Sequence, residues 1–291
     1  MIETGYGLIL SGEIPPSRVV AAFTEVSLVR GEYVMRRSGR YVTTATGRDA
    51  LQRYLKEICL AFYPKPVWYR LSDFESREIS TLDGADAHLD EENPILGPRG
   101  TRRALLFPDA FLHEATCVAN VMADWSNLRY MPSYVGTVDE LSDLLYLICT
   151  NDLPPPTGCM IEVPSAVWQA AQIRDTGMER LLIGLNDLTS LLFGAHRGTP
   201  HHKRDHPMID EVVASVARGT GVDTVVANSV SPAHASRLRA AGACLVAIHY
   251  HELPQWSQDP CTDLPDLHLV TDIRRITAGL LAVRREGELS A

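Results

Sequence analysis

The sequence predicts an α/β fold, and most simply a (β/α)8 barrel, because short apolar segments alternate with amphipathic ones. The apolar segments are continuous runs, which is typical of strands that are covered on both faces. A length of 291 residues suits such a barrel. A doubly wound open sheet gives a similar alternation and remains a second interpretation. The candidate strands are residues 7–11, 67–71, 104–107, 128–133, 159–163, 181–185, 224–228 and 245–250.

Helix boundaries are marked by capping patterns between several of these strands. Thr137, followed by Glu140 three residues later, forms a capping-box pattern before an amphipathic stretch. Pro232 after a serine opens another helix, and Gly242 closes it. Apolar residues at helical spacing predict a last helix over about residues 270–287. We therefore expect residues 1–291 to form a single barrel domain.

The charge balance argues against several classes of partner. Lysine and arginine number 27 against 36 acidic residues, a net charge of −9, and an acidic surface repels nucleic acid and anionic lipid. No apolar run approaches the roughly 18 residues that span a bilayer, and no leader pattern follows Met1. Six dispersed cysteines without a CxxC pair predict free thiols. We therefore expect a cytoplasmic protein that binds neither nucleic acid nor membrane.

Carboxylates and arginines stand where candidate strands end. Glu162 and Asp187 belong to two different strand ends, which in a barrel face the same mouth, and two carboxylates with water and substrate oxygens suit Mg²⁺. Arg70 ends a strand, whereas Arg99 and Arg197 lie in loops, and guanidinium groups suit a phosphate or a carboxylate. Each residue alone has an ordinary explanation, such as capping or surface exposure. Their co-occurrence predicts a divalent cation and a small anionic, phosphorylated substrate.

At these residues the sequence resembles the C-terminal, phosphoenolpyruvate (PEP)/pyruvate-binding barrel of the PEP-utilising enzymes. Within that family it is most similar to the PEP synthases, with pyruvate phosphate dikinase and enzyme I of the sugar phosphotransferase system as relatives. The similarity runs in order from about residue 5 to residue 250. The matching segments are AFYPKPV (61–67), RLSDF (70–74), EENPILG (91–97) with Arg99 and Gly100, TVDE (137–140), IEVPS (161–165) and NDLT (186–189), with Arg197 beyond the last.

The resemblance implies a TIM barrel of the PEP/pyruvate superfamily, with PEP or pyruvate as substrate and Mg²⁺ as cofactor. Glu162 and Asp187 match the family's metal ligands. The arginines match residues that hold the phosphoryl group and the enolate oxygen, and the amide matches a residue that orients substrate beside the metal. The residues at these substrate-binding positions are Arg70, Arg99, Asn186 and Arg197. Because family members commonly dimerise through this barrel, a homodimer is expected.

The sequence also departs from the family pattern. Neither a nucleotide-binding domain nor the Gly-Gly-x-Thr-Cys-His signature of the phosphohistidine domain is found in these residues. We therefore expect a stand-alone barrel whose phosphohistidine or nucleotide-binding partner is a separate protein. Asn228 aligns with the family's cysteine that exchanges a proton with the methyl carbon of pyruvate. An amide cannot take up or release a proton near neutral pH, so that role is lost at Asn228.

Histidines near two strand ends are further candidates for chemistry. Residues 196–206 hold four histidines beside Arg197, but their spacing matches no strong zinc pattern, and a metal or acid–base site and a mobile lid both remain open. His249 and His251 lie near the end of the eighth strand, where His249 is a candidate for proton transfer. The catalytic candidates are therefore Arg70, Arg99, Arg197, Asn228 and His249.

Three functions fit these residues. The first is an Mg²⁺-dependent phosphoryl transfer from or to an enolpyruvate. The second is a carbon–carbon lyase or aldolase that uses a Mg²⁺-stabilised pyruvate enolate, whose carbon attacks an aldehyde or ketone instead of a proton, so that the cysteine is dispensable. The third is a catalytically degenerate barrel that binds PEP as a sensor or scaffold, which the intact metal and arginine positions disfavour.

Overall fold

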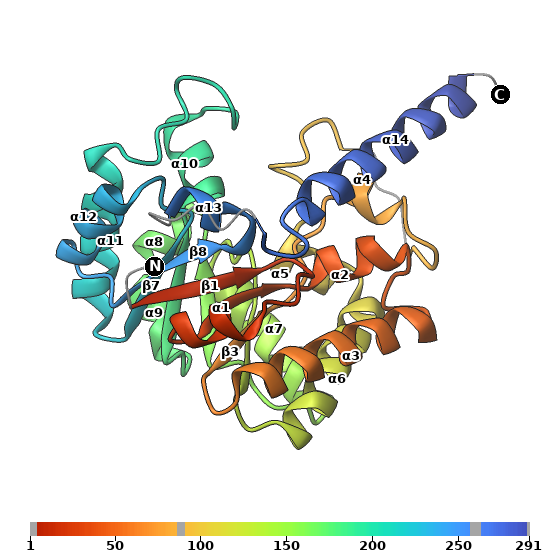
Figure 1. The fold of residues 1–291 in the computed structure, drawn as a ribbon, viewed down its shortest axis with the longest axis horizontal. Helices are drawn as coiled ribbons and strands as arrows, with labels where there is room; N and C mark the ends of the chain where they lie inside the picture. The colour runs from red at the N-terminus through yellow and green to blue at the C-terminus, as the bar shows by residue number, and fades with distance from the viewer. Residues whose placement is uncertain (1–4, 86–90, 257–262, 290–291) are drawn as a thin grey trace.

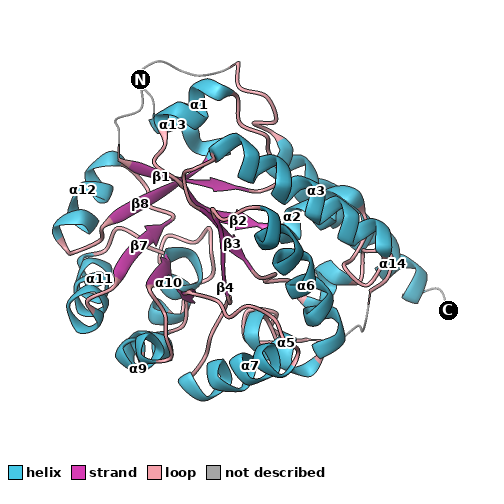
Figure 2. Ribbon diagram, turned by 90° about the horizontal axis from the view of Figure 1, so that it is seen from below, coloured by secondary structure: helices cyan, strands magenta, loops and turns pink. Residues whose placement is uncertain are grey.

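Eight parallel strands form a nearly closed barrel surrounded by helices in the computed structural model, which describes residues 5–85, 91–256 and 263–289 (Figure 2). The strand order is β4-β3-β2-β1-β8-β7-β6-β5. The two outer strands meet where the Met160 backbone N–H donates to the Pro132 carbonyl at 3.1 Å. The predicted barrel is therefore confirmed, and an open sheet is excluded. The strands are β1 (Tyr6–Leu10), β2 (Val26–Arg30), β3 (Val67–Arg70), β4 (Leu128–Met131), β5 (Gly158–Ile161), β6 (Arg180–Gly184), β7 (Asp223–Ala227) and β8 (Leu245–His249).

One predicted strand was wrong, and one true strand was not predicted. Residues 104–107 mostly belong to helix α5 (Gly100–Leu106), which begins at Gly100 with a φ of +47°. This helix leaves Leu106 exposed, so the apolar run there is not a buried strand. The missed strand is β2, in which the buried Ser27 interrupts the apolar run and donates a hydrogen bond to the Glu25 carboxylate. Because Ser27 is polar, residues 26–30 do not form the continuous apolar run from which the other strands were predicted.

The helices follow the strands in chain order and cover the outside of the barrel. The predicted cap at Thr137 is present, since its hydroxyl accepts from the Glu140 N–H at 3.2 Å. The helices not yet given are α1 (Ser17–Ala22), α2 (Gly31–Ser38), α3 (Ala45–Phe62), α4 (Ser76–Ile79), α6 (Pro108–Asp124), α7 (Val138–Thr150), α8 (Pro164–Trp168), α9 (Ala170–Asp175), α10 (Leu185–Phe193), α11 (Pro207–Thr220), α12 (Pro232–Ala240), the 3₁₀ turn η1 (Tyr250–Glu252), α13 (Leu253–Trp256) and α14 (Leu269–Leu289).

Helix α14 projects from one side of the barrel mouth, beside α2 and α4 (Figure 1). Its first turns are anchored by a small apolar cluster of Tyr33, Val270 and Ile273. The Arg36 guanidinium on α2 reinforces this contact by donating to the Thr277 hydroxyl at 3.0 Å. Since α2 directly follows β2, the C-terminal helix is fixed to the end of a barrel strand that opens into the mouth.

Two further expectations concern thiols and membranes. The five described cysteines are all free, and Cys261 lies outside the described residues. Among the helices that the structure describes, none combines the length and apolar character needed to cross a membrane.

The floor of the barrel holds a buried ion pair. Arg180, at the start of β6, donates to the Glu25 carboxylate at 2.6 Å, and both side chains are buried. The guanidinium also lies over the Trp68 ring, with its central carbon 4.4 Å from the ring centroid. Its other carboxylate contact is Asp223 at 3.4 Å, whose side chain is 62% exposed. Glu25 is therefore the main compensation for the buried guanidinium charge.

We expect Glu25→Ala to lower the free energy of unfolding by roughly 3–5 kcal/mol, because it leaves Arg180 buried without its close partner. Chemical denaturation measures this change. The matched control is Asp175→Ala, which removes a partner of the half-exposed Arg174 and should cost less than about 1 kcal/mol. Equal losses in the two variants would contradict this role for Glu25.

Candidate active site

A cavity of about 610 Å³ opens at the carboxyl ends of the strands, which is where (β/α)8 barrels carry their chemistry. It is lined by side chains from the ends of β2, β3, β5, β7 and β8, from the loops beyond them, and from α14. The structure brings every sequence-predicted site residue to this cavity: Arg70, Arg99, Glu162, Asn186, Asp187, Arg197, Asn228 and His249.

Three buried carboxylates gather at one side of the cavity. Asp73, Glu162 and Asp187 each offer an oxygen, and these oxygens lie within 4.8 Å of one another. An octahedral Mg²⁺ site holds its ligand oxygens roughly 3–4 Å apart, so small side-chain rotations would complete it. The donors are hard oxygens, as Mg²⁺ requires. These three residues therefore fit a divalent cation.

Asp73 is a site residue that the sequence prediction missed. It lies three positions beyond Arg70, in the loop that follows β3, and it is 6% exposed. It accepts two hydrogen bonds from Arg99, from Nε at 3.0 Å and from Nη2 at 2.7 Å. The sequence signal that could have identified Asp73 was its position in the RLSDF segment, three residues after the strand end at Arg70.

Arginines alternate with these carboxylates. Arg99 Nη1 lies 3.5 Å from Asp187 Oδ1, and Arg197 Nη2 lies 2.5 Å from the same oxygen. Arg70 Nη1 lies 3.5 Å from Asp73 and 3.7 Å from Glu162. The result is a chain of opposite charges in which most carboxylates contact more than one arginine.

Burial and pairing set the charge states of this cluster. Burial lowers the pKa of Arg99, but Asp73 and Asp187 outweigh it and hold that pKa well above its ordinary value. Burial raises the pKa of Asp73, but Arg99 and Arg70 reverse the effect and bring it below its ordinary value. For Glu162, burial outweighs the attraction of Arg70 and raises the pKa to about 7. The arginines therefore stay charged, and Glu162 is the carboxylate whose charge is least compensated.

The histidine-rich loop contributes through two side chains rather than through a metal site. His202 Nε2 lies 2.9 Å from the Asn186 carbonyl oxygen. Arg204 donates to the Asn186 side-chain oxygen and to the Asn228 carbonyl, both at 3.1 Å. Of the residues described, only Asp73, Glu162 and Asp187 form a cluster that could hold a metal. The loop therefore connects the residues that follow β6 and β7, and its histidines are not part of the metal-binding cluster found in the described part of the chain.

Asn228 and His249 form a pair at the ends of β7 and β8. The Asn228 side-chain nitrogen lies 2.6 Å from His249 Nε2. Because an amide N–H can only donate, Nε2 accepts and the neutral ring carries its proton on Nδ1. Burial, reinforced by the charges of Arg30 and other neighbours, lowers the pKa of His249 well below its ordinary value. The imidazole is therefore neutral near pH 7.

Comparison with known proteins identifies the family. Residues 19–244 match the model of the PEP-utilising enzyme, PEP-binding domain. This chain belongs to that family. The match covers most of the barrel, including every carboxylate and arginine of the charged cluster.

The curated relatives of this PEP-binding domain are much longer proteins. It is 29% identical over 209 residues to a probable PEP synthase of Methanocaldococcus jannaschii, covering 66% of this chain and 18% of that protein. It is 26% identical over 220 residues to the PEP synthase of Pyrococcus furiosus, covering 69% and 27%. It is 36% identical over 160 residues to the PEP synthase of Deinococcus radiodurans, covering 52% and 20%. The chain thus matches only a fifth to a quarter of these proteins.

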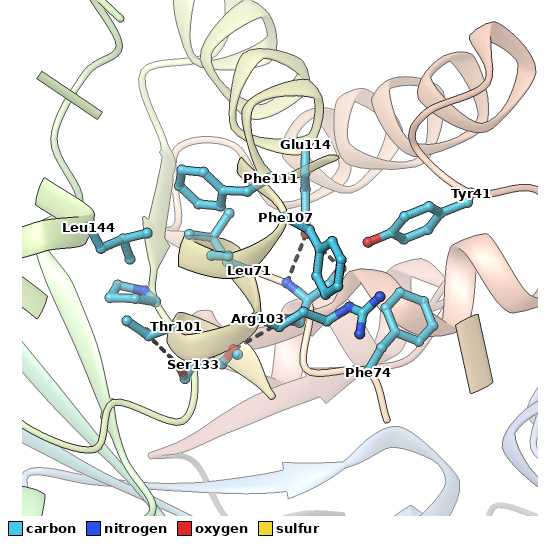
Figure 3. A pocket seen from close by; sticks show the side chains of 14 residues that line it. Tyr41, Leu71, Phe74, Thr101, Arg103, Phe107, Phe111, Glu114, Ser133 and Leu144 are labelled. Atoms are coloured by element: carbon cyan, nitrogen blue, oxygen red, sulfur yellow. Dashed lines mark hydrogen bonds between the residues drawn. The ribbon is translucent and has the colours of Figure 1, made fainter. Parts of the chain in front are cut away.

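A further buried carboxylate, that of Glu114, supports the end of β3 and the loop that carries Asp73. Glu114 reaches from α6 toward this loop, beside a pocket of about 30 Å³ (Figure 3). It accepts hydrogen bonds from the Tyr69 hydroxyl at 2.6 Å and from the Ser72 N–H at 2.8 Å. Burial raises the pKa of Glu114 to about 7. The folded protein therefore favours the protonated acid.

This raised pKa predicts a pH dependence of stability. The folded state holds the Glu114 proton up to about pH 7, whereas the unfolded state releases it near its ordinary value of 4.5. The contribution of Glu114 to the free energy of unfolding therefore falls as the pH rises from about 4.5 to about 7, by at most about 1.4 kcal/mol per pH unit. Glu114→Gln keeps an oxygen acceptor and should be more stable than the wild type at pH 8 but not at pH 4.5. Denaturation at both pH values tests this, and an unchanged difference would contradict it.

Proposed function

We propose that this barrel binds PEP or pyruvate together with Mg²⁺ and catalyses phosphoryl transfer from or to an enolpyruvate. The observation that carries the proposal is the alternation of three arginines with three buried carboxylates in one cavity of a PEP-binding domain. Arginines match the phosphoryl and carboxylate groups of PEP, and carboxylates match a divalent cation.

The ion pairs of the site couple the two ligands. A cation that binds Asp187 draws that carboxylate away from Arg197 and Arg99, which now lie 2.5 and 3.5 Å from it. Arg197, and the part of the Arg99 guanidinium that does not hold Asp73, are then available to the anionic substrate. Substrate binding alone would leave buried carboxylates facing an anion, which is unfavourable. Mg²⁺ and PEP should therefore each increase the affinity of the other, by the same factor.

The chain's own residues account for the transfer as follows. The bond between phosphorus and the bridging oxygen breaks, the electron pair stays on the enolate oxygen, and the phosphoryl group passes to an acceptor. When bound at Asp73, Glu162 and Asp187, Mg²⁺ supplies positive charge for the enolate oxygen. Arg70 lies 3.7 Å from Glu162 and so stands beside the same position. Arg99 and Arg197 hold the phosphoryl oxygens.

His249 and Asn228 are proposed to handle the proton at the methylene carbon. The family's cysteine position is occupied by Asn228, which cannot exchange a proton. The neutral His249 ring lies within 2.6 Å of this amide and lines the same cavity. We propose that Asn228 keeps Nε2 of the neutral ring unprotonated, and that Nε2 takes the methyl proton when the enolate forms and returns it when the enolate is protonated. The acceptor is proposed to be a histidine of a separate protein, which becomes phosphohistidine when PEP is the donor and gives the phosphoryl group back in the reverse direction. Dimerisation and a cytoplasmic location stay predictions.

Glu162→Gln should lower the affinity for PEP in the presence of Mg²⁺ by more than about tenfold and remove its dependence on Mg²⁺, because the neutral amide is a poor ligand for the cation. Isothermal titration calorimetry with and without Mg²⁺ measures both effects. Glu140→Gln is the matched control, since this carboxylate pairs with the half-exposed Arg102 outside the cavity. Unchanged affinity in Glu162→Gln would refute the metal site.

The proposed proton transfer is tested by deuterium exchange into the methyl group of pyruvate, followed by proton NMR with Mg²⁺ in D₂O. His249→Gln should slow this exchange by about 100-fold or more, because positioned acid–base groups contribute at least that much. His196→Gln, in an exposed loop position, is the control. Equal exchange rates in His249→Gln and the wild type would assign the proton transfer elsewhere.

Carbon–carbon bond formation is the second candidate function, and the cavity volume favours it. A volume of about 610 Å³ exceeds what a three-carbon acid phosphate fills, which leaves room for a carbonyl compound beside the enolate.

NMR of one reaction mixture, containing the protein, PEP or pyruvate, Mg²⁺ and candidate acceptors, distinguishes the two functions. A phosphorylated acceptor in the ³¹P spectrum supports phosphoryl transfer, an aldol product in the ¹H spectrum supports the lyase, and binding without turnover contradicts both.

A further inference from the structure

The cavity has a second side that the proposed PEP and Mg²⁺ positions do not use. It lies between the ends of β2 and β8, the histidine-rich loop and helix α14. We call it the α14 side. The residues that define it are Arg30, Tyr33, Arg204, His251, Glu252 and Arg274.

Positive charge on the α14 side is poorly compensated. Arg274 donates from Nε to the Tyr33 hydroxyl at 3.0 Å, and Arg204 donates to an amide oxygen and a carbonyl. Neither guanidinium makes an ion pair with a carboxylate among the described residues. Arg30 pairs with Glu32 at 3.3 Å, but that same oxygen also serves Arg70. The Glu32 carboxylate is thus shared between two arginines, and positive charges outnumber negative charges on the α14 side.

The contrast with the carboxylate side shows that this positive charge is not a general property of the mouth. There, Arg99 holds Asp73 through two hydrogen bonds and also approaches Asp187. On the α14 side, the Glu252 carboxylate also lines the cavity, and burial raises its pKa although Arg204 opposes this effect. Burial also lowers the pKa of Arg204, and the charge of Glu252 offsets only part of this effect.

Two buried imidazole nitrogens point to the same conclusion. Nδ1 of His249 and Nδ1 of His251 are both buried without a hydrogen-bond partner in the described part of the chain. The His249 side chain is 6% exposed, and the two rings lie 4.9 Å apart. Buried polar atoms are nearly always paired in native proteins, so two unpaired nitrogens on residues that line one cavity mark a place where a ligand can supply the partner. Neutral imidazoles each offer one donor or one acceptor to such a ligand.

We propose that the α14 side binds the anionic group of a second small-molecule substrate, next to PEP or pyruvate. The recognised chemistry is a carboxylate or phosphate oxyanion, held by Arg274 and Arg204, with His251 hydrogen-bonding its polar atoms. This inference rests on the proposed binding of PEP or pyruvate, and it names the class of small molecule that would share the cavity with the enolate in the carbon–carbon candidate. It also assigns a role to α14, which brings Arg274 to the mouth from outside the barrel.

The test titrates two probes, succinate and inorganic phosphate, into the protein saturated with PEP and Mg²⁺. We expect at least one probe to bind at one site per chain without displacing PEP, and the better probe identifies which oxyanion is preferred. Arg274→Gln should weaken that binding by at least about tenfold, the usual cost of losing a charged hydrogen bond. Arg275→Gln is the matched control on the same helix, because its side chain is 80% exposed and pairs with Asp272.

Three results would overturn the proposal. The first is that neither probe binds, and the second is that both bind only by displacing PEP. The third is that Arg274→Gln and Arg275→Gln bind the probes equally. If the PEP proposal itself fails, PEP and Mg²⁺ will not bind to the wild type. The two arginine variants can then be compared for probe binding to the protein alone, so failure of the second site is distinguishable from failure of the first.

Discussion

The mouth of this barrel depends on the mutual compensation of charges that are buried together. Asp73 is shared by Arg70 and Arg99, and Asp187 is shared by Arg99 and Arg197. A buried charge without a partner is strongly unfavourable, so none of these side chains can be placed without the others. Electrostatic interactions therefore tie together the ends of β3 and β5 and the first turn of α10. The same requirement makes the site responsive, because a cation and an anion can replace the internal partners together.

Much of the site could be predicted from the sequence, because parallel barrel strands deliver their carboxyl ends to one place. Arg70 and Glu162 stand at the ends of apolar runs, and no knowledge of tertiary packing is needed to place them at the mouth. The strand prediction failed for β2, which carries polar residues that make specific contacts. Ser27 bonds to Glu25 on the barrel floor and Arg30 faces the mouth, so β2 does not look like a buried strand.

Other site residues could not be predicted because their positions depend on loops and on the C-terminal helix. Asp73 is held by Arg99 from a distant loop, a contact that no local periodicity encodes. Arg204 lies in a polar run whose histidines attract attention as metal ligands, yet it is the arginine that reaches Asn186. Arg274 lies on α14, and its arrival at the cavity depends on the packing of that helix against α2. Tertiary contacts alone determine these three positions.

The proposed replacement of the family's cysteine by Asn228 is best understood together with the neighbouring His249. An amide alone cannot exchange a proton with the methylene carbon, but this amide donates to Nε2 of a buried imidazole and so keeps that nitrogen unprotonated. The ring is held neutral by burial and by Arg30, whose position at the end of β2 also contributes positive charge to the α14 side. The charge that would attract a second anion is thus the charge that keeps His249 neutral. Binding of that anion would offset Arg30 and make the imidazole a stronger base, so occupancy of the second position would promote proton exchange at the first.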